Sequence, residues 1–174
     1  MARNSWWLVI CVSVGLAALV LAWLPSAWPN PLADERLDPQ QALTRLQPAA
    51  AAVDAACRAG DRGAFAEATT AGYREDLEAR LQVVDGVLDS ATLQGMSRAS
   101  SCEQWLRQPV LAVLVDGEYA AVAVRREQGD GAQVLSFRWD GEQFRLSGMR
   151  HAPRVASESA AQRYLRELLR QMGL

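Results

Sequence analysis

Two Asp-Gly pairs lie between runs of β-forming residues, and they constrain the fold more than any other feature of the chain. Asp116-Gly117 and Asp140-Gly141 each separate two stretches of this kind. Asp-Gly between such stretches is the strongest short-range hairpin signal, because both turn residues must adopt positive φ. Gly129-Asp130-Gly131 can join the two hairpins, so the sequence predicts a four-stranded antiparallel meander. The predicted strands are residues 109–115, 118–126, 133–139 and 142–149.

The second hairpin has a register that can be checked against burial. A two-residue turn at Asp140-Gly141 pairs apolar side chains with apolar ones and polar side chains with polar ones, which makes this register self-consistent. The predicted partners are Phe137 with Phe144 and Leu135 with Leu146 on one face, and Arg138 with Gln143 and Ser136 with Arg145 on the other.

The first strand, in contrast, is apolar on both faces. Leu111, Val113 and Val115 face one way. The other face is also apolar and consists of Val110, Ala112 and Leu114. A strand of this kind needs cover on both sides. Helices can supply one side, and the other needs a closing helix, a folded-over pocket or a partner. A closing helix is expected from about Ser157, where apolar residues recur at helical spacing, and we interpret its stripe as core packing. The stripe is Ala161, Tyr164, Leu165, Leu168, Leu169 and Met172.

The first half of the domain is expected to be helical. Residues 49–59 are rich in Ala and end at Gly60, which is typical of a helix and its C-cap. Asp61 can then cap a second short helix that runs through Thr69.

A third helix is expected over residues 72–88, and a short fourth one around Trp105. Ser100 and Glu103 fit a capping box that opens the fourth helix. The third helix has an i,i+4 ion pair between Asp76 and Arg80, and an apolar stripe at helical spacing. That stripe is Tyr73, Leu77, Leu81, Val84 and Leu88.

Residues 6–24 contain no charge and predict a membrane-spanning helix. Nineteen helical residues span roughly 28 Å, close to the hydrocarbon thickness of a bilayer. Indole rings favour the headgroup level, so tryptophans at both ends of the run fit a spanning helix. These predicted interface residues are Trp6, Trp7, Trp23 and Trp28.

Arg3 precedes the predicted span, and the positive-inside tendency then places residues 1–5 in the cytoplasm. Residues 25–40, which hold four of the seven prolines, predict a semi-rigid linker. Residues 41–174 would form an α+β domain outside the cytoplasm, on the inner membrane of a bacterium. The alternative is a signal peptide that is cleaved near Ala22, which would release a secreted domain.

The charge balance argues against a nucleic-acid partner. The net charge is −2, and the 18 basic residues, all arginine, form no concentrated footprint. The absence of lysine indicates the codon bias of a GC-rich bacterial genome. The expected partners are the lipid bilayer, through residues 6–24, and other envelope proteins or a second copy of the chain.

Few residues in the sequence suggest catalysis or the binding of a metal or cofactor. His151 is the only histidine, and three scattered cysteines do not supply a zinc site, so we expect no metal, cofactor or catalytic residue. Cys57 and Cys102 are candidates for a disulfide in an oxidising compartment, worth roughly 4 kcal/mol in the chain-entropy model. The alternative is two buried free thiols, with Cys11 in the predicted span.

Two other groups of residues could form a site, but the sequence does not favour either. A basic cluster after the last strand could bind an anion or a lipid headgroup, but interspersed acids indicate solvated strand ends. An isomerase-like enzyme would need a proton-transfer group inside the fold, and Tyr119, Asp85 and Asp89 are not placed to share a proton. The basic cluster consists of Arg145, Arg150, His151 and Arg154, with Arg125 and Arg126 nearby.

The stretch from Ala56 to Phe65, followed by Tyr73-Arg74-Glu75, resembles the helix–Gly-Asp–helix opening of the nuclear transport factor 2-like superfamily. The resemblance covers about residues 45–150 and implies a cone-shaped α+β fold. Members include isomerases, dehydratases, ligand binders and assembly subunits, and bitopic bacterial members include scaffold subunits of type IV secretion channels. Fold alone does not decide function. We therefore expect a non-enzymatic interaction or scaffold module, with a small-molecule binder that uses the interior of the cone as the alternative.

Overall fold

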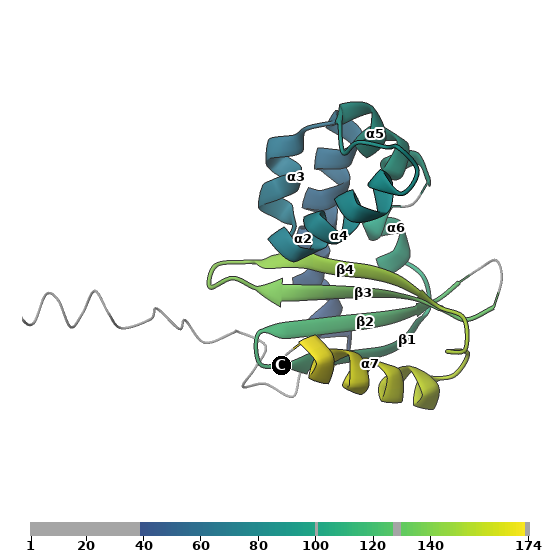
Figure 1. Cartoon of the computed structure of the whole chain (residues 1–174). Coiled ribbons are helices and arrows are strands. Elements are labelled where there is room, and N and C mark those ends of the chain that lie inside the picture. The colour runs from purple at the N-terminus through teal and green to yellow at the C-terminus, as the bar shows by residue number, and fades with distance from the viewer. Residues whose placement is uncertain (1–38, 100, 127–129, 173–174) are drawn as a thin grey trace, which may run out of the picture.

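The computed structural model describes residues 39–99, 101–126 and 130–172. Within these ranges five helices precede a four-stranded sheet, and one helix follows it (Figure 1). The helices are α2 (Pro39–Ala59), α3 (Arg62–Ala68), α4 (Ala71–Gln82), α5 (Ser90–Ala99), α6 (Cys102–Leu106) and α7 (Glu158–Met172). The strands are β1 (Val110–Asp116), β2 (Tyr119–Arg125), β3 (Ala132–Trp139) and β4 (Phe144–Ala152).

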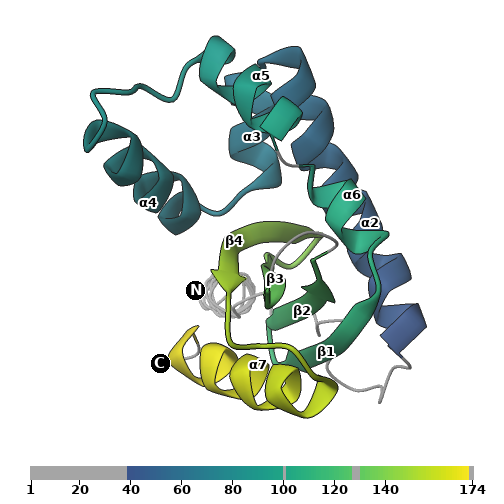
Figure 2. The same ribbon diagram turned by 90° about the vertical axis from the view of Figure 1, so that its right-hand side faces the viewer.

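The sheet separates two helical layers. Figure 1 shows α2 to α6 on one side and α7 on the other, and the turned view in Figure 2 shows the strands curving between them. The strand order is β1-β2-β3-β4, and each neighbouring pair is antiparallel. The predicted α+β class, the four-stranded meander and the C-terminal amphipathic helix are therefore confirmed.

The membrane-spanning helix in the predicted fold class needs correction. No helix in residues 39–99, 101–126 and 130–172 is long and apolar enough to cross a membrane. The longest of these helices, α2, has 21 residues but carries Arg45, Asp54 and Arg58, and α7 has only 15. A span needs about 20 mostly apolar residues. The predicted single-pass signal anchor thus has no counterpart among these helices.

Residues 6–24 lie outside the described residues, and so do the four predicted interface residues. The same holds for the predicted tail (1–5), for Cys11, for the cleavage alternative near Ala22, and for all of the predicted linker except its last two residues. The interface residues concerned are Trp6, Trp7, Trp23 and Trp28.

The junction between α2 and α3 forms as its sequence predicts. Gly60 adopts a φ of 65°, and its N–H and that of Asp61 close the last turn of α2 on the carbonyls of Cys57 and Ala56. The carboxylate of Asp61 then accepts the N–H of Ala64 at 3.0 Å and caps α3.

The predicted third helix ends earlier than residue 88. The N–H of Gly86 bonds the carbonyl of Leu81 at 2.8 Å, and Asp85 adopts a φ of 53°. This arrangement closes α4 in the manner of a Schellman motif, with Asp85 in the left-handed position. Val84, which the helical stripe predicts to be buried, is 72% exposed as a result. The Asp76–Arg80 ion pair is present at 2.5 Å.

Two short helices also depart from the prediction. The sequence did not predict α5, which begins where the carboxylate of Asp89 accepts the N–H of Thr92 at 2.8 Å. The cap of α6 is Ser101, whose hydroxyl accepts the N–H of Gln104 at 3.1 Å, so the capping residue lies one position beyond the predicted Ser100.

Both hairpins are shifted by two residues from the predicted register. The Asp140 carboxylate accepts the N–H groups of Glu142 and Gln143, and this holds a four-residue loop in place of a two-residue turn. In the first hairpin Asp116 pairs with Tyr119. A shift of two preserves the face of a side chain, because side chains alternate with period two. A bulge between Leu146 and Gly148 reverses the faces of β4 beyond it, so Met149 lies on the side of Leu135 and Phe137. The observed partners in the second hairpin are Trp139 with Phe144, Phe137 with Leu146, Arg138 with Arg145 and, beyond a bulge, Leu135 with Met149.

Each face of the sheet supports its own core. Val122, Leu135 and Phe137 pack under α2 to α6, whereas Ala121 and Val134 pack against α7. The predicted cover on both faces is thus confirmed, and the α7 stripe is core. A bulge between Val110 and Ala112 puts Leu111 on the α7 side, opposite to the predicted face. The buried residues of the α7 stripe are Ala161, Leu165, Leu168 and Leu169.

Candidate functional site

The space between the helical layer and the sheet is filled by side chains. Phe65, Leu93 and Phe137 are each at most 1% exposed and lie in one continuous core. Two grooves of the described residues adjoin at the β3–β4 hairpin, where both include Trp139.

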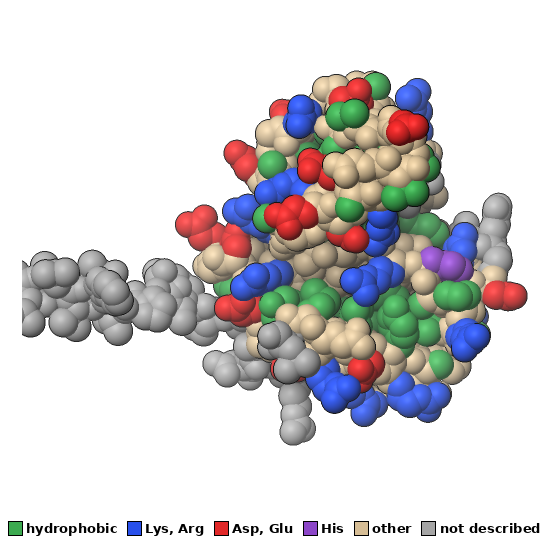
Figure 3. Space-filling view, in the orientation of Figure 1, with side chains coloured by type: hydrophobic (Ala, Val, Ile, Leu, Met, Phe, Trp, Pro, Cys, Tyr) green, Lys and Arg blue, Asp and Glu red, His purple; other side chains and the backbone are tan. Residues whose placement is uncertain are grey.

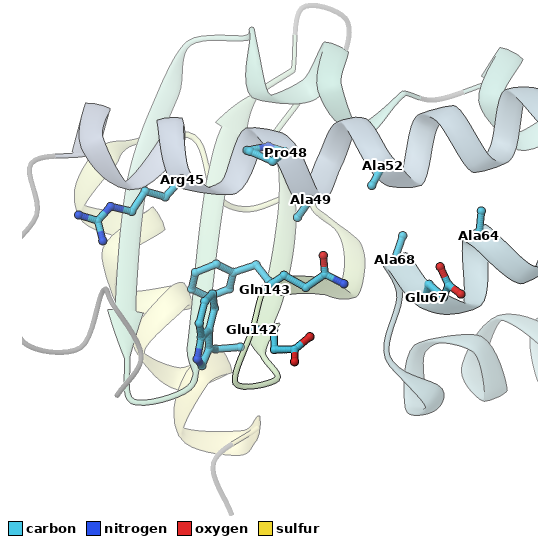
Figure 4. A pocket seen from close by; sticks show the side chains of 11 residues that line it. Arg45, Pro48, Ala49, Ala52, Ala64, Glu67, Ala68, Glu142 and Gln143 are labelled. Carbon is cyan, nitrogen blue, oxygen red and sulfur yellow. The ribbon is translucent and has the colours of Figure 1, made fainter. Parts of the chain in front are cut away.

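The first groove, called here the alanine groove, has a volume of about 440 Å³ and lies between α2, α3 and the β3–β4 hairpin. Its walls include four small side chains from α2 and α3, which leave room for an occupant. Figure 4 shows Glu142 and Gln143 extending from the hairpin toward α3, which carries Glu67. The small residues of the walls are Ala49, Ala52, Ala64 and Ala68.

The second groove, called here the arginine groove, has a volume of about 430 Å³ and lies where α4 begins beside the ends of β3 and β4. Figure 3 shows arginine side chains along the boundary between the helical layer and the sheet on this face. Three guanidinium groups and two carboxylates line the arginine groove. The charged residues are Arg74, Arg138, Arg145, Glu118 and Asp140.

Trp139 forms part of the wall of both grooves. Its ring packs on Phe144, with centroids 5.1 Å apart. Its indole N–H is buried and has no hydrogen-bond partner in the part of the chain that the structure describes. Buried donors without an acceptor are uncommon in native proteins, so this one marks a position where an added acceptor would be favourable.

The two edges of the sheet differ in how they are protected. The β4 edge carries Arg145, Arg150 and His151, and the N–H of Thr70 bonds the carbonyl of Leu146 at 3.0 Å. Charges, bulges and covering segments of this kind block further strand pairing. β1 is the opposite edge, and it carries no charge before Asp116.

A second apolar feature lies at the turn after α4. Val83, Val84 and Val87 are 85%, 72% and 68% exposed, and they are the large exposed hydrophobic side chains of the described chain. The αL residue Asp85 lies among them. Because α4 ends at Gln82, the turn presents these valines to solvent and does not bury them against the sheet.

Cys57 and Cys102, the candidate disulfide, are both buried, and both are free thiols in the structure. Burial raises the pKa of the Cys57 thiol to about 11, with Asp54 adding to the rise and Arg58 opposing it. Burial likewise raises the pKa of Cys102 and of the nearby Tyr73 hydroxyl. Thiols in such surroundings are protonated and inert near neutral pH. The bond between them stays a prediction.

Sequence reasoning missed Asp54, whose carboxylate contributes to the raised pKa of both thiols. Its side chain is on α2 and is only 2% exposed. It accepts the hydroxyl of Ser101 at 2.5 Å and the N–H of Cys102 at 2.9 Å, so it anchors the start of α6. A lone aspartate in an Ala-rich helix gives no sequence signal of this role, because its partners are 47 and 48 positions away.

The basic residues that the sequence offered as an anion site are dispersed in the structure. Arg126 Nη1 lies 3.3 Å from both ring nitrogens of the exposed His151, while Arg150 and Arg154 are exposed nearby. Arg145 is at the opposite end of β4 and pairs with Asp140.

The three candidate residues for proton transfer are likewise not grouped together in the structure. Tyr119 packs against Arg138, whose guanidinium carbon is 5.6 Å from the ring centroid. Asp85 and Asp89 lie in the turn between α4 and α5. Within the described ranges, no group of three or more His, Cys, Asp or Glu residues could hold a metal ion.

No family model, no curated protein and no solved structure matches this chain. The resemblance to the nuclear transport factor 2-like superfamily therefore stays a prediction, and function has to be argued from the surfaces above.

Proposed function

We propose that this domain is a non-enzymatic interaction module that pairs with a second copy of itself along β1. The observation that carries the proposal is the open β1 edge. Among the described strands β1 has one neighbour, β2, and its side chains from Val110 to Val115 are apolar on both faces. An uncharged, apolar edge strand is a template for pairing with another strand.

The register of the first hairpin determines which backbone groups are available. Asp116 pairs with Tyr119 across a two-residue loop, so these two residues exchange hydrogen bonds. Alternate residues of an antiparallel strand direct their N–H and C=O to opposite edges. Leu114 and Ala112 therefore bond β2, and Val113 and Val115 present their backbone groups to the open edge.

A second copy of β1 suits this edge. With a twofold axis at Leu114, Val113 of each copy lies opposite Val115 of the other, and each such pair exchanges two hydrogen bonds. The two Asp116 carboxylates then lie about 14 Å apart along the strands, beyond the Debye length at physiological salt. Both apolar layers would continue across the axis, because β1 contributes side chains to the core on each face.

Val113→Pro tests this geometry. Proline is tolerated on an edge strand where the replaced N–H points outward. We expect sedimentation equilibrium of the full chain to show a dimer that Val113→Pro converts to monomer. Because Val113 packs against the core, this variant should lose some thermal stability, but less than a proline that also breaks a bond to β2. Leu114→Pro, which removes such a bond, should lower the melting temperature further.

Val84→Lys is the matched control, because it removes an exposed valine away from β1. Its dimer should be unaffected. A wild-type chain that stays monomeric up to its solubility limit would overturn the proposal. So would a folded Val113→Pro variant that still dimerises.

A further inference from the structure

We propose that the arginine groove binds an oxyanion, a ligand that carries a carboxylate or phosphate group. The groove is on the β4 side of the sheet, and β1 is the opposite edge. This binding site is therefore separate from the self-pairing edge and does not depend on it.

Arg74 carries a positive charge that no carboxylate of the groove neutralises through an ion pair. Its Nη1 donates to the carbonyls of Ala66 and Thr69, at 2.8 Å and 2.7 Å, and to the Thr69 hydroxyl at 3.3 Å. These acceptors are neutral and hold the guanidinium in place. Among the described residues no carboxylate forms an ion pair with it.

Arg138 and Arg145 are held by carboxylates but remain accessible. Arg138 donates to Glu118 at 3.1 Å, and both side chains of this pair are about half exposed, at 51% and 58%. Arg145 pairs with Asp140, and these side chains are 34% and 26% exposed. Ion pairs with this much solvent contact contribute little stability, so an incoming anion can share the guanidinium groups at small cost.

The hydrogen-bond donors of the arginine groove indicate which class of ligand it can bind. Three guanidinium groups face two carboxylates, which leaves the groove one positive charge in excess. Planar guanidinium groups match carboxylate and phosphate oxygens in bidentate geometry. The buried indole N–H of Trp139 is a further donor in the wall and has no acceptor among the residues that the structure describes. At Gly141 nothing lies within 4 Å of where a Cβ would be, so the loop side of the groove is open.

The test uses the indole N–H of Trp139 as a local reporter. The full chain is labelled with ¹⁵N-tryptophan, and of the signals from its six tryptophans the one lost in Trp139→Phe belongs to Trp139. Inorganic phosphate and acetate are titrated separately at constant ionic strength. We expect saturable movement of the Trp139 signal, with Trp105 unmoved. Saturation by phosphate alone assigns a phosphate group, and saturation by both assigns a carboxylate-compatible site.

Arg138→Gln should weaken binding about tenfold, equivalent to the loss of one charge-assisted contact. Arg80→Gln is the matched control, because Arg80 is an exposed, ion-paired arginine on α4 that does not line the groove. No saturable shift with either anion would overturn the proposal, and so would equal weakening by the two substitutions. Val113→Pro should leave the titration unchanged, so failure of self-pairing and failure of anion binding can be told apart.

Discussion

The carboxylate of Asp54 accepts the backbone N–H of Cys102 at 2.9 Å, although 48 positions separate the two residues. This bond joins the middle of α2 to the first turn of α6. A carboxylate at a helix N-terminus satisfies N–H groups that have no partner within the helix. The start of α6, and the path of the chain into β1, therefore depend on one buried side chain.

Asp54→Ala should lower the free energy of unfolding by about 3 kcal/mol, because it leaves buried donors without an acceptor. Urea unfolding monitored by circular dichroism measures the change. Asp76→Ala is the control: it removes an exposed i,i+4 pair and should cost less than about 0.5 kcal/mol. Equal effects of the two substitutions would contradict the anchoring role of Asp54.

The raised pKa of Cys57 predicts a loss of stability at alkaline pH. The folded state holds the thiol proton up to a pKa of about 11, against 9.0 ordinarily, so between these values it binds more protons than the unfolded state. Stability is then fully present below pH 9 and falls as the pH rises through 11, by at most about 3 kcal/mol. Unfolding measured from pH 8 to 11 should show a shallower decline for Cys57→Ala than for the wild type.

The predicted Cys57–Cys102 disulfide can be tested by two measurements. A Cys57–Cys102 bond leaves no thiol to titrate, so the alkaline decline assigned to Cys57 would be absent. Non-reducing peptide mass mapping of the full chain detects the linked peptides directly. Alkylation of both cysteines after unfolding without reductant would rule the bond out.

Gly131→Ala should be strongly destabilising. Gly131 has a φ of 92°, and an added Cβ would lie 2.3 Å from the carbonyl oxygen of Ala152. Backbone atoms cannot move aside cheaply, so we expect a loss of about 3 kcal/mol or more. Gly117→Ala is the control, because Gly117 also has positive φ but nothing lies within 4 Å of its Cβ position. Its cost should be about 1 kcal/mol in thermal unfolding.

Leu165→Ala tests the assignment of α7 to the core. Leu165 is 0% exposed and packs under the Ala- and Val-lined face of the sheet. We expect a loss of about 2–5 kcal/mol. The neighbouring Arg166→Ala should change stability by less than about 0.5 kcal/mol, since that side chain is exposed. If Leu165→Ala costs as little as Arg166→Ala, α7 is not a core element.

Local sequence patterns predicted the strands, their order and the closing helix. The alternation of residues 133–139 placed Leu135 and Phe137 on one buried face, and both are 0% exposed. These features depend on period-two and helical spacing, which are properties of neighbouring residues. The Asp61 cap has the same origin, because its partner Ala64 is three positions away.

Such local patterns could not predict the register of the hairpins. The sequence allows two loops at Asp140. Asp140 can be the first residue of a two-residue turn, or its side chain can accept the hydrogen bonds that hold a four-residue loop. Both give the same faces, since they differ by two residues. The choice between them depends on the side-chain bonds of Asp140 and on the packing of Trp139 against Phe144.

By itself, the sequence determined the α+β class, the meander and the amphipathic cover of both sheet faces, because periodicity and turn chemistry act over a few residues. Only the tertiary structure decided which side chains meet across long separations. It buried Asp54 against Ser101 and Cys102, placed Arg74, Arg138 and Arg145 along one groove, and put β1 at an edge of the described sheet. The physical reason is that these contacts form between elements, so no local pattern records them.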